Sequence, residues 1–280
     1  MRFPKLLSLM TALAIATSCA SLPVERASVG GADYGYTVLG SGGPVIILEA
    51  GLGDGRNSWR SLAPELANSA TVFVYDRPGY GGHFLSDPTL DSDRDGQRTG
   101  AEVAESLHDL LAVAGLQGPY ILAGHSIGGL YVQSFAKLYP DETAGLVLVD
   151  SRPPAFSDRC VETGASNCTL PAAMRLLLEP HIRAEYDGGV ATMSFVRDPA
   201  ELGDLPITVL AAMRPGPGAS AGSQQLWLEE QRAFADRALN ARYVEVPDAG
   251  HYIHRQRQDL VLSEIRAMIG RAAVPPQESE

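Results

Sequence analysis

A serine stands between two glycines at the point where an apolar run changes to a helical pattern. The run from Tyr120 to Leu130 reads YILAGHSIGGL and places Ser126 between Gly124 and Gly128. A serine on a tight strand-to-helix turn is held in a strained backbone with its hydroxyl above the sheet edge, and a side chain at either glycine would clash. The N-terminus of the following helix favours negative charge there. Ser126 is therefore the candidate nucleophile; the alternative is a glycine-rich turn with an incidental serine.

A serine nucleophile needs a base, and His251 is the best placed of the six histidines. It follows a β-rich run and precedes the last helical pattern. His254 could join it as a second metal ligand, but no nearby carboxylate or cysteine completes such a site, so we expect no metal. The remaining histidines have ordinary loop, helix or cap positions, and His125 is expected to point away from Ser126 because neighbours on a turn diverge.

Three motifs resemble the α/β-hydrolase superfamily of serine hydrolases. They are GHSIGG around Ser126, DRPGYG from Asp76, and DAGH ending at His251. The similarity runs from about Tyr34 to Ile269. It implies the chain order serine, acid, histidine, and cleavage of a carboxylic ester or related small-molecule acyl compound without a cofactor. Amide, lactone and carbon–carbon bonds remain alternatives, as does a hydrolase-fold binding protein without turnover, which the intact serine and histidine disfavour.

The acid is the least defined member of this set. Much of the family carries it after the strand expected at 207–213, but the following stretch 214–228 contains no Asp or Glu. Asp150 ends the preceding apolar run, where some family members carry the acid, and we expect it to orient the histidine. Glu229 and Glu230, in a predicted helix, remain alternatives, whereas Asp248 is typical of a turn.

An acyl-transfer serine also needs backbone N–H donors for the developing oxyanion. One expected donor is Ile127, the residue after the nucleophile. The resemblance places the other at Leu52, in the glycine-rich loop after the first apolar run. The family often has His-Gly where this chain has Ala50-Gly51. The backbone role is unaffected, because the histidine is not the donor.

The elements that must position these residues alternate between strand and helix. Continuous apolar runs indicate strands buried on both faces of a parallel sheet. Helices are expected at 100–114, where Thr99 and Glu102 form a capping box, and at 129–138 and 259–269. The fold class is thus α/β, a doubly wound and mostly parallel sheet of the α/β-hydrolase type. The expected strands are 44–49, 70–75, 120–123, 145–149, 207–213 and 241–246.

One segment interrupts the alternation. Residues 151–204, between the strands ending at Asp150 and Met213, are too long for an ordinary crossover and are expected to form a cap over the active end of the sheet. A helix is expected at 171–186, with an apolar stripe of Met174, Leu177, Leu178 and Ile182. The alternative is a long loop without a role in substrate choice.

Composition limits the classes of partner. The chain has 280 residues and a mass of 29.7 kDa, which suits one large α/β domain or two small ones. It carries 33 acidic and 22 basic side chains, a net charge of −11. This balance argues against nucleic-acid binding and against simple electrostatic adhesion to anionic lipid.

The first eighteen residues are expected to be a signal peptide. A short basic start precedes an apolar run, and the string Ala16-Thr17-Ser18-Cys19 resembles a bacterial lipoprotein signal. The resemblance implies cleavage before Cys19 and lipid attachment to it; the alternative is a secretory signal cut near Ala20. The protein is then expected to be exported to the periplasm or outer surface, with the membrane reached only through the anchor.

An exported location makes a disulfide between Cys160 and Cys168 plausible. The expected organisation is a signal peptide at 1–18, a linker at 19–33, one hydrolase domain at 34–270 and a flexible tail at 271–280.

Overall fold

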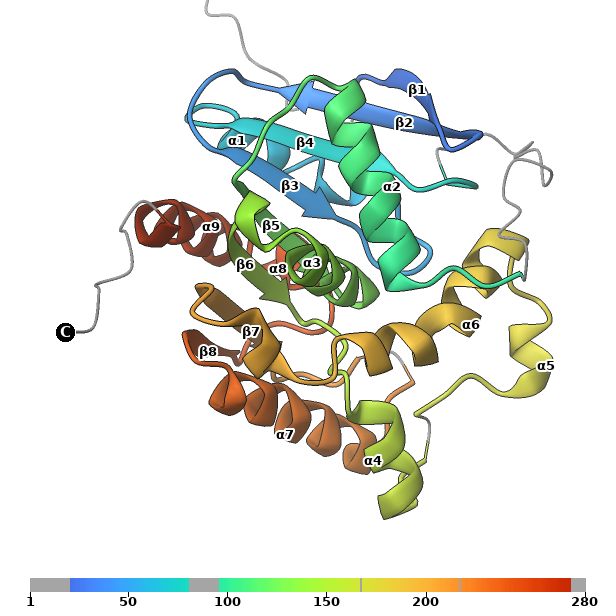
Figure 1. Ribbon diagram of the computed structural model, residues 1–280. Coiled ribbons are helices and arrows are strands. Elements are labelled where there is room, and N and C mark those ends of the chain that lie inside the picture. The colour runs from blue at the N-terminus through green and yellow to red at the C-terminus, as the bar shows by residue number, and fades with distance from the viewer. Residues whose placement is uncertain (1–20, 81–95, 167, 217, 273–280) are drawn as a thin grey trace, which may run out of the picture.

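The apolar runs of the sequence form the centre of the molecule as strands of one sheet (Figure 1). The computed structural model describes residues 21–80, 96–166, 168–216 and 218–272. Their strands lie in the order β1-β2-β4-β3-β5-β6-β7-β8. The pairs β1·β2 and β2·β4 are antiparallel and the others parallel, which confirms the predicted fold class. The strands are β1 Glu25–Val29, β2 Ala32–Leu39, β3 Val45–Glu49, β4 Thr71–Asp76, β5 Tyr120–His125, β6 Thr143–Val149, β7 Ile207–Ala212 and β8 Ala241–Val246.

The expected linker at 19–33 is wrong for its second half. Residues 25–29 form β1, which pairs with β2 as a hairpin at the sheet edge. Only Val29 of β1 is buried, so an edge strand with polar, solvent-facing side chains lacks the apolar run that identified the inner strands. The domain also continues past 270, because helix α9 ends at Ala272; residues 273–280 lie outside the described part.

Helices cover both faces of the sheet. On one face, α2 Gly100–Val113, α3 Ile127–Leu138 and α7 Ala221–Arg237 contribute side chains to one apolar core. On the other, α1 Ala63–Leu66 and α9 Gln258–Ala272 form a second core. The predicted capping box begins α2: the Glu102 amide donates to Thr99 Oγ1 over 3.4 Å, and the Thr99 amide donates to Glu102 Oε2 over 2.7 Å. The remaining short helices of the core are η1 Arg56–Trp59, η2 Pro140–Glu142 and α8 Ile253–Gln256.

In its described residues the cap, 151–204, contains three α-helices, which are drawn towards the right and the bottom of Figure 1. The extent of the helix expected at 171–186 is wrong. The first helix ends at Arg175, and a second helix begins at Pro180, a residue type that suits the first helical position. Met174 and Leu177 are 53% and 84% exposed, so they form no buried stripe. The cap helices are α4 Phe156–Thr163, α5 Ala172–Arg175 and α6 Pro180–Phe195, followed by η3 Pro199–Leu202.

Within the described ranges, no helix is both long enough and apolar enough to span a bilayer.

Candidate active site

Ser126 lies on the sharp turn between β5 and α3. Its backbone has φ +55° and ψ −122°, a conformation that a residue with a side chain adopts only under strain. A Cβ at Gly124 would overlap the carbonyl of Gly128. A Cβ at Gly128 would lie 2.5 Å from the carbonyl oxygen of Ala50. Both flanking glycines are therefore required by close backbone approach, as the sequence predicted.

The structure brings Ser126, His251 and Asp150 together from three distant parts of the chain. His251 Nε2 is 3.0 Å from Ser126 Oγ, and His251 Nδ1 is 2.7 Å from Asp150 Oδ2. A carboxylate only accepts hydrogen bonds, so the geometry assigns the proton to Nδ1 and leaves the Nε2 lone pair facing the serine. A histidine in this tautomer can take a proton from the hydroxyl.

The Asp150 carboxylate is buried and held on its other side as well. It is 3% exposed, and its Oδ1 accepts three hydrogen bonds. The donors are the Ala212 amide at 3.1 Å, Trp227 Nε1 at 3.1 Å and Gln231 Nε2 at 3.0 Å. Trp227 and Gln231 come from α7, so the helix that follows β7 supplies hydrogen-bond donors to this carboxylate.

The alternative acids have other partners. Glu229 accepts from Gln225 over 2.8 Å, and Glu230 accepts from Arg159 over 3.0 Å. Asp248 pairs with Arg257 at 2.8 Å. Within the described ranges, none of these three carboxylates bonds to the histidine.

The two expected oxyanion donors lie beside one apolar cluster. Ile127 belongs to it, and Leu52 packs against it. Arg77 holds the loop of Leu52 in place, since its Nη1 donates to the Ala50 carbonyl over 2.9 Å and its Nη2 to the Gly51 carbonyl over 3.0 Å. These bonds fix the backbone from which the Leu52 amide projects.

Arg77 is also the centre of a buried ionic network that the sequence analysis missed. It bonds Glu49 at the end of β3 over 2.5 Å and Glu185 of α6 over 2.6 Å. Glu185 further accepts from Tyr80 over 2.9 Å and from Arg98 over 3.2 Å. A glutamate at the end of a fully apolar strand run was the available signal, because a buried carboxylate requires a partner.

The two carboxylates of this network differ in charge preference. Burial raises the pKa of Glu49 above its ordinary value in spite of Arg77. Burial opposes the charge of Glu185 too, but two arginines outweigh it and its pKa is lowered. The cap is thus joined through an ionised Glu185 to Arg77, which holds the loop that carries Leu52.

Two neutral histidines pack beside His251. His125 Nε2 donates to the backbone carbonyl of His251 over 2.8 Å, and the His125 and His254 rings are 4.4 Å apart. Burial holds the pKa of His125 well below its ordinary value and lowers that of His254 to about 3. The side chain of His125, which was expected to point away from Ser126, supports the backbone of His251 through this bond. Across the described ranges, no group of three or more possible metal-ligating residues forms a metal site.

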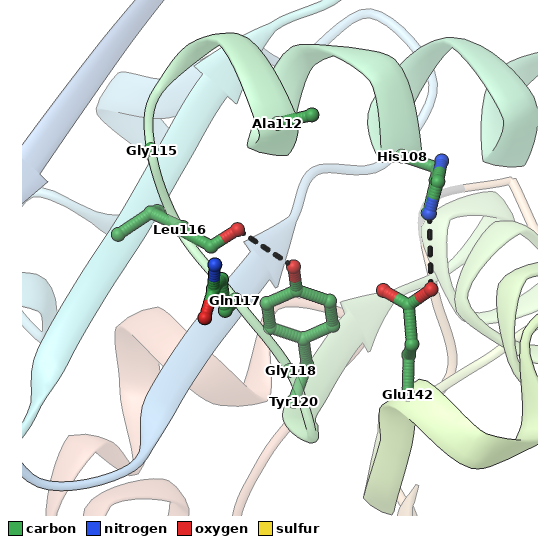
Figure 2. A pocket seen from close by; sticks show the side chains of 8 residues that line it. All are labelled: His108, Ala112, Gly115, Leu116, Gln117, Gly118, Tyr120 and Glu142. Atoms are coloured by element: carbon green, nitrogen blue, oxygen red, sulfur yellow. Dashed lines mark hydrogen bonds and ion pairs between the residues drawn. The ribbon is translucent and has the colours of Figure 1, made fainter.

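A separate hollow lies at the other end of β5 (Figure 2). It is lined by Tyr120, the first residue of that strand, and by His108, whose Nε2 is 3.0 Å from Glu142 Oε1. Ser126 follows the opposite end of the same strand, so this hollow is not part of the candidate active site.

The cysteines have different outcomes. Cys160 of α4 is joined to Cys168 by a disulfide. Cys19 and the expected signal peptide lie outside the described residues.

Comparisons with known proteins agree with this architecture. The chain has the α/β-hydrolase fold, and the family model described as the alpha/beta hydrolase fold matches residues 44–169. The structure of a thermophilic esterase from Thermogutta terrifontis superposes with a TM-score of 0.61 at 22% identity, covering 90% of this chain and all of that one, a likeness of fold.

Two sequence relatives extend the comparison. The protein YqjL of Bacillus subtilis is 23% identical over 79% of this chain and 82% of its own length. RutD of Azorhizobium caulinodans, whose name proposes a carbamate hydrolase, is 35% identical over 48% of this chain and 47% of its own length, so the match spans about half of that protein. Together the matches show that the chain is similar to α/β-hydrolases in sequence over residues 44–169 and in fold.

Proposed function

We propose that the protein is a serine hydrolase that cleaves a carboxylic ester through an acyl-enzyme intermediate. The observation that carries the proposal is the continuous chain of hydrogen bonds from Asp150 through His251 to Ser126, with separations of 2.7 and 3.0 Å. The strained turn under the serine and the helix that begins at Ile127 suit a nucleophile and the negative charge that forms beside it.

In the first half of the reaction, Ser126 Oγ attacks the ester carbonyl carbon while His251 Nε2 takes the hydroxyl proton. The carbonyl oxygen becomes an oxyanion, to which the Leu52 and Ile127 amides donate. The intermediate then collapses, the ester carbon–oxygen bond breaks, and the imidazolium gives its proton to the departing alcohol. Asp150 stabilises the imidazolium while it carries that proton.

In the second half, His251 takes a proton from water, and the resulting hydroxide attacks the acyl carbon. The same amides hold the second oxyanion. Its collapse breaks the bond to Ser126, whose oxygen recovers the proton from His251, and the carboxylic acid leaves. Every proton taken is returned, so the cycle needs only water.

A hydrolysis screen tests this function. 4-Nitrophenyl esters of graded acyl length should be hydrolysed by the wild type and not by Ser126→Ala, whereas Ser263→Ala on the exposed face of α9 should match the wild type. Amides, lactones and carbamates belong beside the esters, the last because of the name of the RutD relative. Turnover of another class with no ester cleavage would replace the ester assignment, and no turnover of any would favour a binding protein.

We also propose that the protein is exported and anchored through lipid on Cys19. The string of small residues ending at Cys19 supports this location. A disulfide between Cys160 and Cys168 also suits an oxidising compartment.

A further inference from the structure

Arg152 is the second residue of the cap. Its backbone is bonded to the candidate nucleophile, and its side chain contacts two of the cap helices. Its amide donates to the Ser126 carbonyl over 3.0 Å. Its Nε donates to Met193 Sδ over 3.4 Å and its Nη2 to Ser157 Oγ over 2.9 Å, while Cζ lies 5.3 Å from the centre of the Phe156 ring. These three neighbours all belong to the cap helices α4 and α6.

The guanidinium has no carboxylate partner among the residues that the structure describes. The guanidinium contacts a thioether, a hydroxyl and an aromatic ring, and its Nη1 has no hydrogen-bond partner among the described residues. Of the four other cap arginines, three have an acidic partner: Arg159 pairs with Glu230, Arg175 with Asp187 and Arg197 with Asp158. The fourth, Arg183, is half-buried and also has no ion pair among the described residues.

This charge is costly where it lies. Burial lowers the pKa of the Arg152 guanidinium from its ordinary value, against the influence of Tyr186, although part of the side chain remains accessible. Arg77, which is more deeply buried, has two carboxylates to offset its desolvation. A desolvated cation without an anion destabilises the fold, and residues that break such a rule concentrate at functional sites.

The guanidinium contacts an apolar cluster that includes one of the expected oxyanion residues. Met193, which accepts from Arg152, belongs to the same apolar cluster as Ile127, and Leu52 packs against that cluster. A cation in contact with this apolar cluster suits a ligand with a hydrocarbon segment and an anionic end.

We propose that Arg152 is a specificity residue that binds a carboxylate of the substrate, so that the preferred ester carries a negative charge in addition to its reacting carbonyl. This inference rests on the proposed ester hydrolysis. A half-ester of a dicarboxylic acid has the required chemistry, with the charge on the acyl side. An ester of a hydroxy acid has it on the alcohol side.

Matched esters test the inference. Mono-4-nitrophenyl adipate and 4-nitrophenyl hexanoate share an acyl chain length and differ in the terminal carboxylate; 4-carboxyphenyl hexanoate and phenyl hexanoate place the difference on the alcohol. The measured quantity is the ratio of kcat/KM for the charged ester to that for its neutral partner. Arg152→Gln should lower this ratio roughly 10- to 100-fold in one of the two pairs, because a charge-assisted hydrogen bond is lost. Arg152→Lys should lower it less.

The control is Arg159→Gln, which removes a cap arginine that lies at the surface and should leave both ratios unchanged. Unchanged ratios in Arg152→Gln overturn the inference while ester hydrolysis stands. A parallel loss on charged and neutral esters also overturns it and makes Arg152 structural. Wild type that cleaves no ester instead contradicts the proposed function.

A binding measurement keeps the inference testable without turnover. Adipate should raise the melting temperature of Ser126→Ala and should raise that of Ser126→Ala/Arg152→Lys less. Equal shifts in the two proteins, or no shift in either, overturn the anion site.

Discussion

Asp150 receives hydrogen bonds on both carboxylate oxygens, and the two sides have different tasks. Oδ1 is anchored by Ala212, Trp227 and Gln231, which fix the carboxylate in place. Oδ2 faces His251 Nδ1 at 2.7 Å. An acceptor there selects the tautomer in which Nε2 can act as a base, and it stabilises the imidazolium.

Replacing Asp150 by Asn should therefore remove catalysis with little effect on folding. The amide oxygen can still accept from the three anchoring donors, but the amide nitrogen presents a donor to His251 and favours the wrong tautomer. We expect kcat for the best ester to fall roughly 10⁴-fold. Steady-state kinetics and the circular dichroism spectrum measure the two effects.

Matched controls separate this role from general loss of charge. Glu229→Gln, Glu230→Gln and Asp248→Asn change carboxylates whose partners are Gln225, Arg159 and Arg257, so each should cost far less. Asp150→Asn with more than about a tenth of the wild-type kcat, a loss under about 1.4 kcal/mol, would rule Asp150 out as the acid.

His254 predicts how stability depends on pH. Its two ring nitrogens have no hydrogen-bond partner, and burial, Arg255 and His251 lower its pKa to about 3, against about 6.5 in an unfolded chain. The unfolded chain therefore binds a proton that the folded protein excludes. His254 does not reduce the free energy of unfolding above about pH 6.5, and it lowers this free energy progressively as the pH falls from there towards 3.

Substitution His254→Leu should reduce this acid sensitivity. Urea unfolding at about pH 7, 6 and 5 should show a slope smaller than that of the wild type by up to about 1.4 kcal/mol per pH unit. Ser263→Ala, which changes an exposed side chain of α9 that does not titrate, should keep the wild-type slope. Identical slopes in His254→Leu and wild type would show that His254 is not held neutral.

At the scale of the elements, the buried carboxylate of Glu185 gives helix α6 an ionic link to the core. Glu185 is fully buried and bonds Arg77, Tyr80 and Arg98, which all come from outside the cap. Because Arg77 also holds the carbonyls of the loop that carries Leu52, the position of the cap and the shape of the oxyanion loop depend on each other.

Glu185→Gln should consequently lower both stability and activity. Removing one charge leaves the buried Arg77 and Arg98 with less compensation, which costs roughly 3–5 kcal/mol in the free energy of unfolding. A shifted oxyanion loop should lower kcat more than it changes KM, since oxyanion donors act mainly in the transition state.

Glu179→Gln is the matched control, because Glu179 is exposed at the beginning of the same helix. Its effect on unfolding should stay within about 0.5 kcal/mol. If Glu185→Gln unfolds at the same urea concentration as Glu179→Gln and keeps its kcat, the ionic network does not hold the cap.

The inner strands could be predicted from the sequence because each is a continuous apolar run that must be buried on both faces. For β8 the predicted bounds match the structure, and for the other five they agree within two residues at each end. The hairpin of β1 and β2 could not be found in this way, since its edge strand carries exposed residues such as Arg26 and Ser28. The break before α6 was visible in Pro180, a helix-start signal that the apolar spacing outweighed.

Some residues of the candidate site could also be predicted from local sequence patterns, and others could not. Ser126 and His251 stand in local motifs, and Asp150 stands at a strand end, so residue type and position were enough to select them. The Arg77–Glu185 contact joins residues 108 positions apart, and no local pattern reports such a pair. Arg152 was missed because an arginine in a loop is ordinary until its surroundings show that no carboxylate accompanies it.

The net charge of the whole molecule bears on how it could associate with a membrane. Without residues 1–18 the chain has 33 acidic and 20 basic side chains, a net charge of −13. Such a domain is repelled by anionic lipid surfaces, so stable membrane association requires the lipid itself.

Metabolic labelling with a palmitate analogue tests the anchor. The wild-type protein should carry the label and sediment with membranes, and Cys19→Ser should be unlabelled and soluble. A label that survives the substitution, or a wild type that never carries one, would mean that Cys19 is not lipidated.

The central claim is that Ser126 is the nucleophile of a working hydrolase. Incubation with a fluorophosphonate, followed by proteolysis and mass spectrometry, measures this most directly, because only an activated serine reacts at an appreciable rate. We predict one adduct per wild-type chain, on the peptide that contains Ser126, a much slower reaction in His251→Ala, and none in Ser126→Ala. A folded wild-type protein that stays unmodified, or an adduct that persists in Ser126→Ala, would contradict the assignment.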